Sequence, residues 1–180
     1  MMRATVHIPA LVSVLPVIAL AALVAGCGGT SFTSQTGDVA GVYSVALTTG
    51  SNGCEFDKWT VGSSVMDVPV TLTQQGTSAT ATVSGPAALV LDLVLGTAQF
   101  QGTVTGDAFT LTAYGSTSLK DGDCAFTIKA SLSGSISNDA IQGQITYSET
   151  TNGNPACAYH STCSSVQSFD GVRAPSADGG

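Results

Sequence analysis

Strict alternation of apolar and polar residues is the feature that most constrains the fold of this chain. In "CAFTIKASL" (124–132), Cys124, Phe126, Ile128, Ala130 and Leu132 share one face, and the residues between them are mostly polar. The segments "MDVPVTLTQ" (66–74) and "AIQGQITYSE" (140–149) alternate in the same way. A period of two residues is typical of half-buried antiparallel strands. No helical period is found after the first 38 residues, so the sequence predicts an all-β domain.

Ten segments are expected to form strands that follow the chain up and down. They are 39–48, 55–62, 66–74, 78–84, 88–95, 98–105, 107–114, 124–137, 140–149 and 163–172. An even number of antiparallel strands can close on itself and remove its edges. We therefore predict a small antiparallel up-and-down β-barrel of about 8–10 strands, with a two-sheet β-sandwich as the alternative.

Three short turns are expected to lie together at one end of this barrel. Gly85-Pro86 and Gly106-Asp107 place glycine first, as a type II′ turn requires, and Asn138-Asp139 suits a type I′ turn. The longer connections, with the turn "QQGTS" (74–78) among them, are expected at the opposite end. The chain should enter at the end that carries the three short turns.

The start of the chain has the pattern of an export signal. One basic residue, Arg3, precedes an apolar run (8–26) that two prolines interrupt, and no basic residue follows the run closely. A basic start, an apolar middle and small residues before a cleavage point describe a secretory signal peptide. The alternatives are an ordinary signal peptide with a chance cysteine and an uncleaved membrane anchor.

The run ends in "LVAGC" (23–27), which resembles the lipobox of bacterial lipoproteins. That resemblance implies removal of residues 1–26 and lipid attachment to the thiol of Cys27, which becomes the first residue of the mature protein. Gly28, where inner-membrane members of that family often carry Asp, favours the outer membrane. We expect a signal peptide at 1–26, a flexible tether at 27–38, the β domain at 39–173 and a loose tail at 174–180.

A second resemblance lies near the first predicted strand. "GVY" (41–43) is similar to the Gly-x-Trp opening of lipocalin and avidin barrels, with Tyr43 in place of the tryptophan. The resemblance implies the same general kind of small barrel.

Charge and composition restrict the function classes. Without Arg3 the mature chain has four basic residues against 12 acidic ones, a net charge of −8. This balance disfavours nucleic acid and anionic lipid as partners. Charged residues are only 9% of the chain, so few titratable groups are available for catalysis. We expect no enzyme activity and no cofactor, although a hydrolase that uses carboxylates is a less favoured alternative.

Four cysteines remain after Cys27, and in an exported protein they are expected to form two disulfides. Counting back from the Asn138-Asp139 turn places Cys124 opposite about Gly153, near Cys157. This register favours the pairs Cys124–Cys157 and Cys54–Cys163, all at the long-loop end. A local Cys157–Cys163 bridge is the alternative.

Four residues are candidates for a ligand-binding rim: Asp92, Asp121, Asp123 and His160. His160 lies in "CAYHSTC" (157–163), where Cys157 and Cys163 could join it as zinc ligands, but disulfides are expected to take up these thiols. Asp121 and Asp123 resemble a fragment of a calcium loop whose remaining oxygen ligands are missing. We therefore predict no metal site.

Asp92 interrupts "ALVLDLVL" (88–95), which is expected to be a strand that is apolar on both faces. Such a strand is either covered on both sides or contacts a partner. These features favour a lipid-anchored, non-catalytic binding or interaction module whose ligand is a small apolar molecule, a glycan or another envelope protein. A purely structural envelope protein is the alternative.

Overall fold

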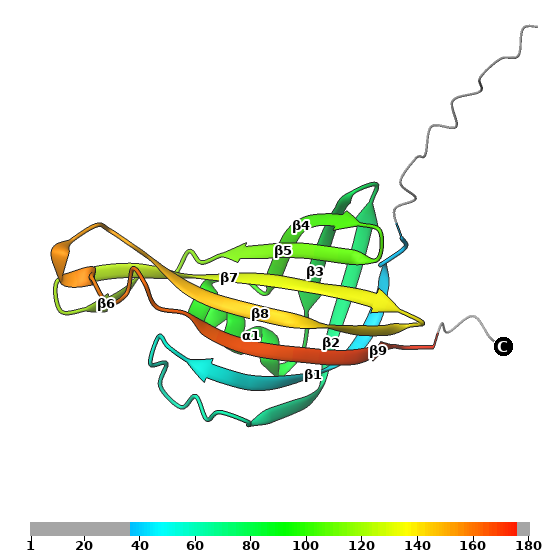
Figure 1. The fold of residues 1–180 in the computed structure, drawn as a ribbon, viewed down its shortest axis with the longest axis horizontal. Coiled ribbons are helices and arrows are strands. Elements are labelled where there is room, and N and C mark those ends of the chain that lie inside the picture. Colours follow the sequence, from blue (N-terminus) through cyan, green and yellow to red (C-terminus); the bar gives the residue numbers. More distant parts are fainter. Residues whose placement is uncertain (1–36, 176–180) are drawn as a thin grey trace, which may run out of the picture. The chain divides into compact units, whose positions relative to one another are not determined.

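Nine strands, one α-helix and one 3-10 turn form the part of the chain that the computed structural model describes, residues 37–175 (Figure 1). The elements are β1 (Gly41–Asn52), β2 (Ser64–Gln75), β3 (Ser78–Val83), α1 (Pro86–Leu95), β4 (Gln99–Thr105), β5 (Ala108–Tyr114), β6 (Leu119–Asp121), β7 (Cys124–Ser137), β8 (Ala140–Thr151), η1 (Pro155–Cys157) and β9 (Ser165–Arg173). The predicted signal peptide, Cys27, most of the tether and residues 176–180 of the tail lie outside the described residues.

Eight of these strands close into an antiparallel barrel, which confirms the predicted fold class over the sandwich. The sheet order is β5-β4-β3-β2-β1-β9-β8-β7-β6, and pairing of β5 with β7 closes the ring and leaves β6 outside it. Every ring strand therefore has two hydrogen-bonded neighbours. The Asn138-Asp139 hairpin sets the register of β7 and β8, with Phe126 opposite Thr151, as the sequence predicted.

The predicted strand at 55–62 is wrong, because this segment is a series of turns. Glu55 and Lys58 have positive φ angles of 54° and 60°, which lie outside the backbone conformation of a regular strand. The turns bring both aromatic residues of the segment, Phe56 and Trp59, against the core. Both rings pack edge to face with Tyr147.

The predicted strand at 88–95 is also wrong, because these residues belong to the helix α1. Pro86 stands at the first helical turn and Gly96 ends the helix with a left-handed φ of 77°, which are the usual residues at these two positions. The Gly85-Pro86 step is thus a helix start and not a hairpin. Among the described residues, no helix combines the length and apolar character needed to cross a bilayer.

Replacing that strand by a helix changes which turns share an end of the barrel. The turns at 75–78, 106–107 and 138–139 lie at one end, which we call the turn end; Thr77 O, for example, accepts a hydrogen bond from Val104 N. The prediction that "QQGTS" lies at the opposite end is therefore wrong. Gly106 has a φ of 58°, and Asn138 and Asp139 have φ of 50° and 64°, as the predicted turn types require.

The chain enters at the turn end, as expected, since Gly37 N donates to Gly106 O at 3.1 Å. The opposite end carries the 53–63 loop, α1, β6 and the 152–164 connection, and we call it the disulfide end. In Figure 1, β7 and β8 extend beyond the ring toward this end, where β6 and the η1 connection lie.

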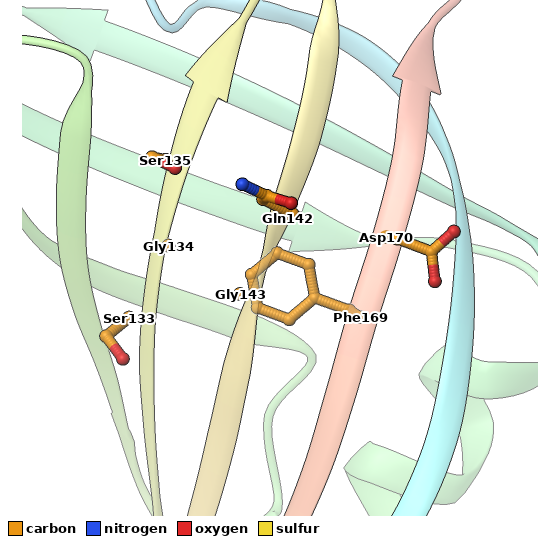
Figure 2. Close-up of a pocket in the computed structure, with 7 residues that line it drawn as sticks. All are labelled: Ser133, Gly134, Ser135, Gln142, Gly143, Phe169 and Asp170. Atoms are coloured by element: carbon orange, nitrogen blue, oxygen red, sulfur yellow. The ribbon is translucent and has the colours of Figure 1, made fainter.

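Two glycines face each other in the barrel wall on β7 and β8 (Figure 2). Gly134 pairs with Gly143. A Cβ on Gly143 would lie less than 2.5 Å from Ser133 O and only 2.5 Å from Cζ of Phe169. A Cβ on Gly134 would lie 2.8 Å from Cζ of both Phe109 and Phe169. The missing side chains let these two rings stack, with centroids 6.4 Å apart, directly against the wall.

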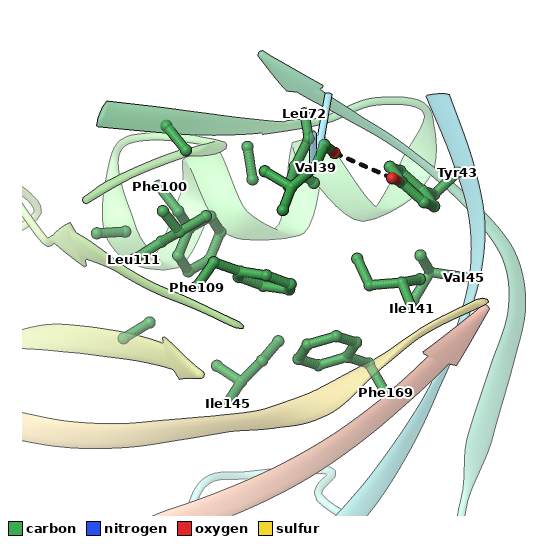
Figure 3. Close-up of a cluster of buried hydrophobic side chains, with 14 of the residues drawn as sticks. Val39, Tyr43, Val45, Leu72, Phe100, Phe109, Leu111, Ile141, Ile145 and Phe169 are labelled. Atoms are coloured by element: carbon green, nitrogen blue, oxygen red, sulfur yellow. Dashed lines mark hydrogen bonds between the residues drawn. The ribbon is translucent and has the colours of Figure 1, made fainter. Parts of the chain in front are cut away.

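Apolar side chains from all eight ring strands and α1 occupy the interior (Figure 3). The largest that are almost fully buried include Tyr43, Phe100, Leu95 and Leu111. Tyr43 keeps its hydroxyl satisfied by donating to Val39 O at 2.9 Å. The lumen is thus a packed core, which is the usual content of a small eight-stranded barrel.

Candidate functional site

Two disulfides fasten the elements that build the disulfide end. Cys54 bonds to Cys163 and Cys124 bonds to Cys157, which are the pairs that the strand register favoured over a local Cys157–Cys163 bridge. The first bridge links the 53–63 loop to the segment before β9. The second links the start of β7 to η1.

A histidine and two carboxylates meet between these bridges. Nδ1 of His160 lies 2.5 Å from Oε2 of Glu149, and Nε2 of the same ring lies 3.3 Å from Oδ2 of Asp121. Glu149 comes from the end of β8, Asp121 from β6 and His160 from the turn after η1. Three separate segments of the chain therefore converge on this imidazole.

The two carboxylates differ sharply in exposure. The Glu149 side chain is 2% exposed and that of Asp121 is 77% exposed, with His160 at 11% between them. A buried carboxylate is costly unless it is paired and hydrogen-bonded. His160 supplies that partner to Glu149 and presents its other nitrogen toward the surface.

Aromatic rings fix the plane of the imidazole. Phe126 stacks on His160 with centroids 4.4 Å apart and an interplanar angle of 20°, and Tyr159 packs edge to face at 5.6 Å. Tyr159 is itself held by a hydrogen bond from its hydroxyl to Gly53 O at 2.8 Å. The ring is therefore positioned by both packing and hydrogen bonds.

The electrostatics of the cluster follow from these contacts. The hydrogen bond to Glu149 raises the pKa of His160, and burial of the ring, which lowers it, offsets only part of the increase. The hydrogen bond to Asp121 raises the pKa further. Nearby, burial raises the pKa of Tyr147 to about 12 and keeps its hydroxyl neutral, bonded to Gln167 at 3.0 Å.

The structure brings together two of the four predicted rim residues. Asp121 and His160 are in contact, and the structure gives the side chains of Asp92 and Asp123 no hydrogen bond or ion pair with another described residue. Asp92 lies exposed on α1, and Asp123 lies exposed in the β6–β7 turn. The four predicted rim residues therefore do not form a single site.

Glu149 is the member of the cluster that sequence reasoning missed. It continues the inward-facing series Ile141, Ile145 and Tyr147 of β8, all of which are buried. An acidic residue at an inward position of a strand was the available signal, because a buried carboxylate requires a partner.

The four cysteines within the described residues contribute no metal site. Cys54, Glu149 and Cys163 bring their ligand atoms within 4.8 Å of one another. Both sulfurs belong to the same disulfide and are not thiolates, so they are not zinc ligands.

The helix α1 presents a second feature at the disulfide end, an apolar outer face. Leu89, Val90 and Leu93 are 72%, 61% and 76% exposed, although they belong to one of the most apolar segments of the chain. Their spacing and that of Pro86 (i, i+3, i+4, i+7) place the four residues on one side of the helix. On the other side, Leu91, Val94 and Leu95 pack into the core.

Outside the barrel, a shallow depression of about 540 Å³ lies over β7, β8 and β9 (Figure 2). Its lining includes Ser133, Ser135, Gln142 and Asp170 around the two wall glycines. The depression lies over the two glycines because their missing side chains bring Phe169 close to the surface. A second depression over β1, β2, β8 and β9 shares Gln142 and Asp170 with it.

Comparisons with known proteins found no match: no protein-family model, no curated protein and no solved structure is significantly similar to this chain.

Proposed function

We propose that this chain is a lipid-anchored protein of the bacterial cell envelope, held at the outer membrane through Cys27. Its disulfide-braced barrel acts as a non-catalytic interaction module whose partner is another envelope protein. The observation that carries the proposal is the apolar outer face of α1 (Leu89, Val90 and Leu93) at the disulfide end.

The position of α1 suits a protein contact. Exposed apolar residues that lie singly are ordinary, but three large ones on one face of a short helix are typical of a contact surface. The helix lies at the end of the barrel opposite the entry of the chain at Gly37. A tether to the membrane therefore leaves this face accessible.

The filled interior supports a surface contact over a small apolar ligand in the lumen. Phe100, Phe109 and Phe169 occupy the space that a lipocalin-like ligand would need. Apolar ligands bind in preformed cavities of a few hundred Å³ that enclose them, and the two depressions described above lie on the outside of the barrel and are open to solvent.

The His160 cluster supports a non-catalytic role. Carboxylates engage both ring nitrogens, so neither is placed to take a proton from a nucleophile. The imidazole lies between Glu149 and Asp121, whereas a glycosidase pair must flank an open space for the substrate.

The lipid anchor is supported by the "LVAGC" motif and by the two disulfides, which are typical of exported proteins. Cys27→Ser removes the thiol that would receive the lipid. We expect loss of labelling by a clickable palmitate analogue and release of the protein from the outer-membrane fraction. Unchanged labelling would contradict the lipid anchor. It would not affect the proposed interaction, which is tested separately.

The interaction is tested by placing a photoreactive amino acid at Leu93 in cells that make the full chain. We expect a crosslinked adduct of one defined mass that disappears when Leu89 is changed to Asp. The matched control is the same amino acid at Gln101, an exposed position on β4. Absence of an adduct, or equal adducts at both positions, would contradict the proposal and favour a purely structural envelope protein.

A further inference from the structure

The cluster at the disulfide end has the geometry that transition-metal sites use to hold a histidine ligand. Metal-bound histidines usually donate their second ring N–H to a carboxylate, which fixes the tautomer and orients the ring. Glu149 occupies that place on Nδ1 of His160 at 2.5 Å. Since an ionised carboxylate only accepts hydrogen bonds, Nδ1 carries a proton toward Glu149. Nε2, which carries a proton toward Asp121 when the imidazole is charged, binds a metal once that proton is lost.

The second ligand stands at the right distance from Nε2. Oδ2 of Asp121 lies 3.3 Å from Nε2. Zinc-to-nitrogen and zinc-to-oxygen bonds of about 2.0–2.2 Å in a tetrahedral site separate two ligand atoms by about 3.3–3.5 Å. An ion can therefore insert between Asp121 and His160 with little displacement of either side chain.

The supporting structure holds the two ligands in place. Asp121 pairs with Cys124 in the β6–β7 ladder, and Cys124 bonds to Cys157, three residues before His160. The stack of Phe126 on the imidazole restricts rotation of the ring. The Cys124–Cys157 disulfide thus fixes Asp121 and His160 relative to each other.

Access and charge also suit a cation. Asp121 is 77% exposed, so an ion can reach the pair and keep water molecules at its remaining positions. Asp121 and Glu149 give the cluster two carboxylates for one imidazole. A neutral imidazole together with a carboxylate suits Zn²⁺ better than Mg²⁺ or Ca²⁺, which prefer oxygen ligands only.

We propose that Nε2 of His160 and the carboxylate of Asp121 bind a divalent transition-metal ion such as Zn²⁺. Glu149 acts as a positioning residue that holds the imidazole, and solvent completes the coordination. When the imidazole is protonated, binding of the ion releases the Nε2 proton to solvent. This site is independent of the α1 surface and of the proposed partner.

The test is a calorimetric titration of ZnCl₂ into the purified full chain in detergent, with both disulfides intact and chelator removed. We expect saturable binding of one ion and no binding of Mg²⁺. Asp121→Asn removes an exposed ligand without disturbing the core, so it should abolish saturable binding. His160→Gln should do the same. Glu149→Gln should weaken binding about 10–100-fold, as loss of the carboxylate behind a ligating histidine does.

The matched control is Asp107→Asn, which removes an exposed carboxylate at the turn end and should leave the affinity unchanged. A nitrogen NMR spectrum of the His160 ring gives a second readout, because zinc should shift the Nε2 resonance and leave Nδ1 protonated. Featureless heats in the unmodified chain would overturn the proposal. Saturable binding that survives in Asp121→Asn and His160→Gln would overturn it as well.

Discussion

At the scale of single residues, one tight constraint lies in the barrel wall at Gly143. Its missing side chain leaves the position that the Phe169 ring occupies, and the adjacent Gly134 does the same for Phe109 and Phe169. These glycines are needed for close approach of both the neighbouring strand backbone and the two rings.

Gly143→Ala should therefore destabilise the barrel by about 1–3 kcal/mol, because the added Cβ forces the ring or the strand to move. Urea denaturation measures the change in the free energy of unfolding. The control is the double variant with Phe169→Leu, which relieves the contact with the ring but leaves the contact of the added Cβ with Ser133 O. Gly143→Ala should cost less in the Phe169→Leu background than in the otherwise unmodified chain. An equal cost would contradict the role of the Phe169 ring and assign the loss to the backbone contact with Ser133.

The His160–Glu149 pair predicts a pH-dependent stability. The folded state raises the pKa of His160, so the folded chain binds the proton more tightly than the unfolded chain does. The resulting stabilisation is fully present below the unfolded pKa of about 6.5 and is lost as the pH rises through the higher folded value. With chelator present, the free energy of unfolding should decline across this range.

The same titration with His160→Gln provides the control, because glutamine does not titrate. The decline above about pH 6.5 should be absent in that variant. A decline of equal size in both proteins would assign the pH dependence to other groups and not to the pair.

At the scale of elements, sequence reasoning was right for β7 and β8 and wrong for α1. The long strands β7 and β8 were predictable, because alternation and the Asn138-Asp139 turn act locally and agree with each other. The segment at 88–95 has apolar residues throughout, and such a run does not distinguish a buried strand from a helix. Pro86 and Gly96, at the two ends of the run, were the signals that favoured a helix.

The candidate site was predictable only in part, because its contacts join elements that are separate in the sequence. Its contacts join β6, β8 and the turn after η1, and β6 was expected to be part of a loop. Asp121 and His160 could be chosen from their chemistry and their place in the long loops. Glu149 required the recognition that the inward face of β8 continues past Tyr147.

The two sides of α1 should differ strongly in their contribution to stability. Leu95→Ala removes a side chain that is fully buried and should cost about 2–5 kcal/mol. Leu93→Ala makes the same chemical change at a side chain that is 76% exposed and should stay within about 0.5 kcal/mol. Chemical denaturation of both variants measures the difference, and similar losses would show that the helix packs differently.

At the scale of the whole molecule, the ring of eight strands and the two disulfides stabilise the barrel in different ways. Ring closure through β5 and β7 leaves no ring strand with an unpaired edge. The disulfides act mainly on the unfolded chain, which they prevent from expanding.

Loop length then predicts the relative effect of removing each bridge. Cys54–Cys163 spans 109 residues and Cys124–Cys157 spans 33. The chain-entropy model gives about 5 and about 4 kcal/mol for the two losses. Paired Cys→Ser variants measured by thermal unfolding at several denaturant concentrations test this order. A larger loss from the shorter loop would indicate that local packing around η1 outweighs chain entropy.

Both ends of the described chain leave the barrel at the turn end. The guanidinium of Arg173, the last residue of β9, donates to Asp38 O at 3.3 Å, so the two ends nearly touch. A short linker could therefore join them, and new termini could be opened elsewhere to give a circular permutant with the same ring. Fusion partners attached at residue 37 or residue 175 would likewise leave the opposite pole unobstructed.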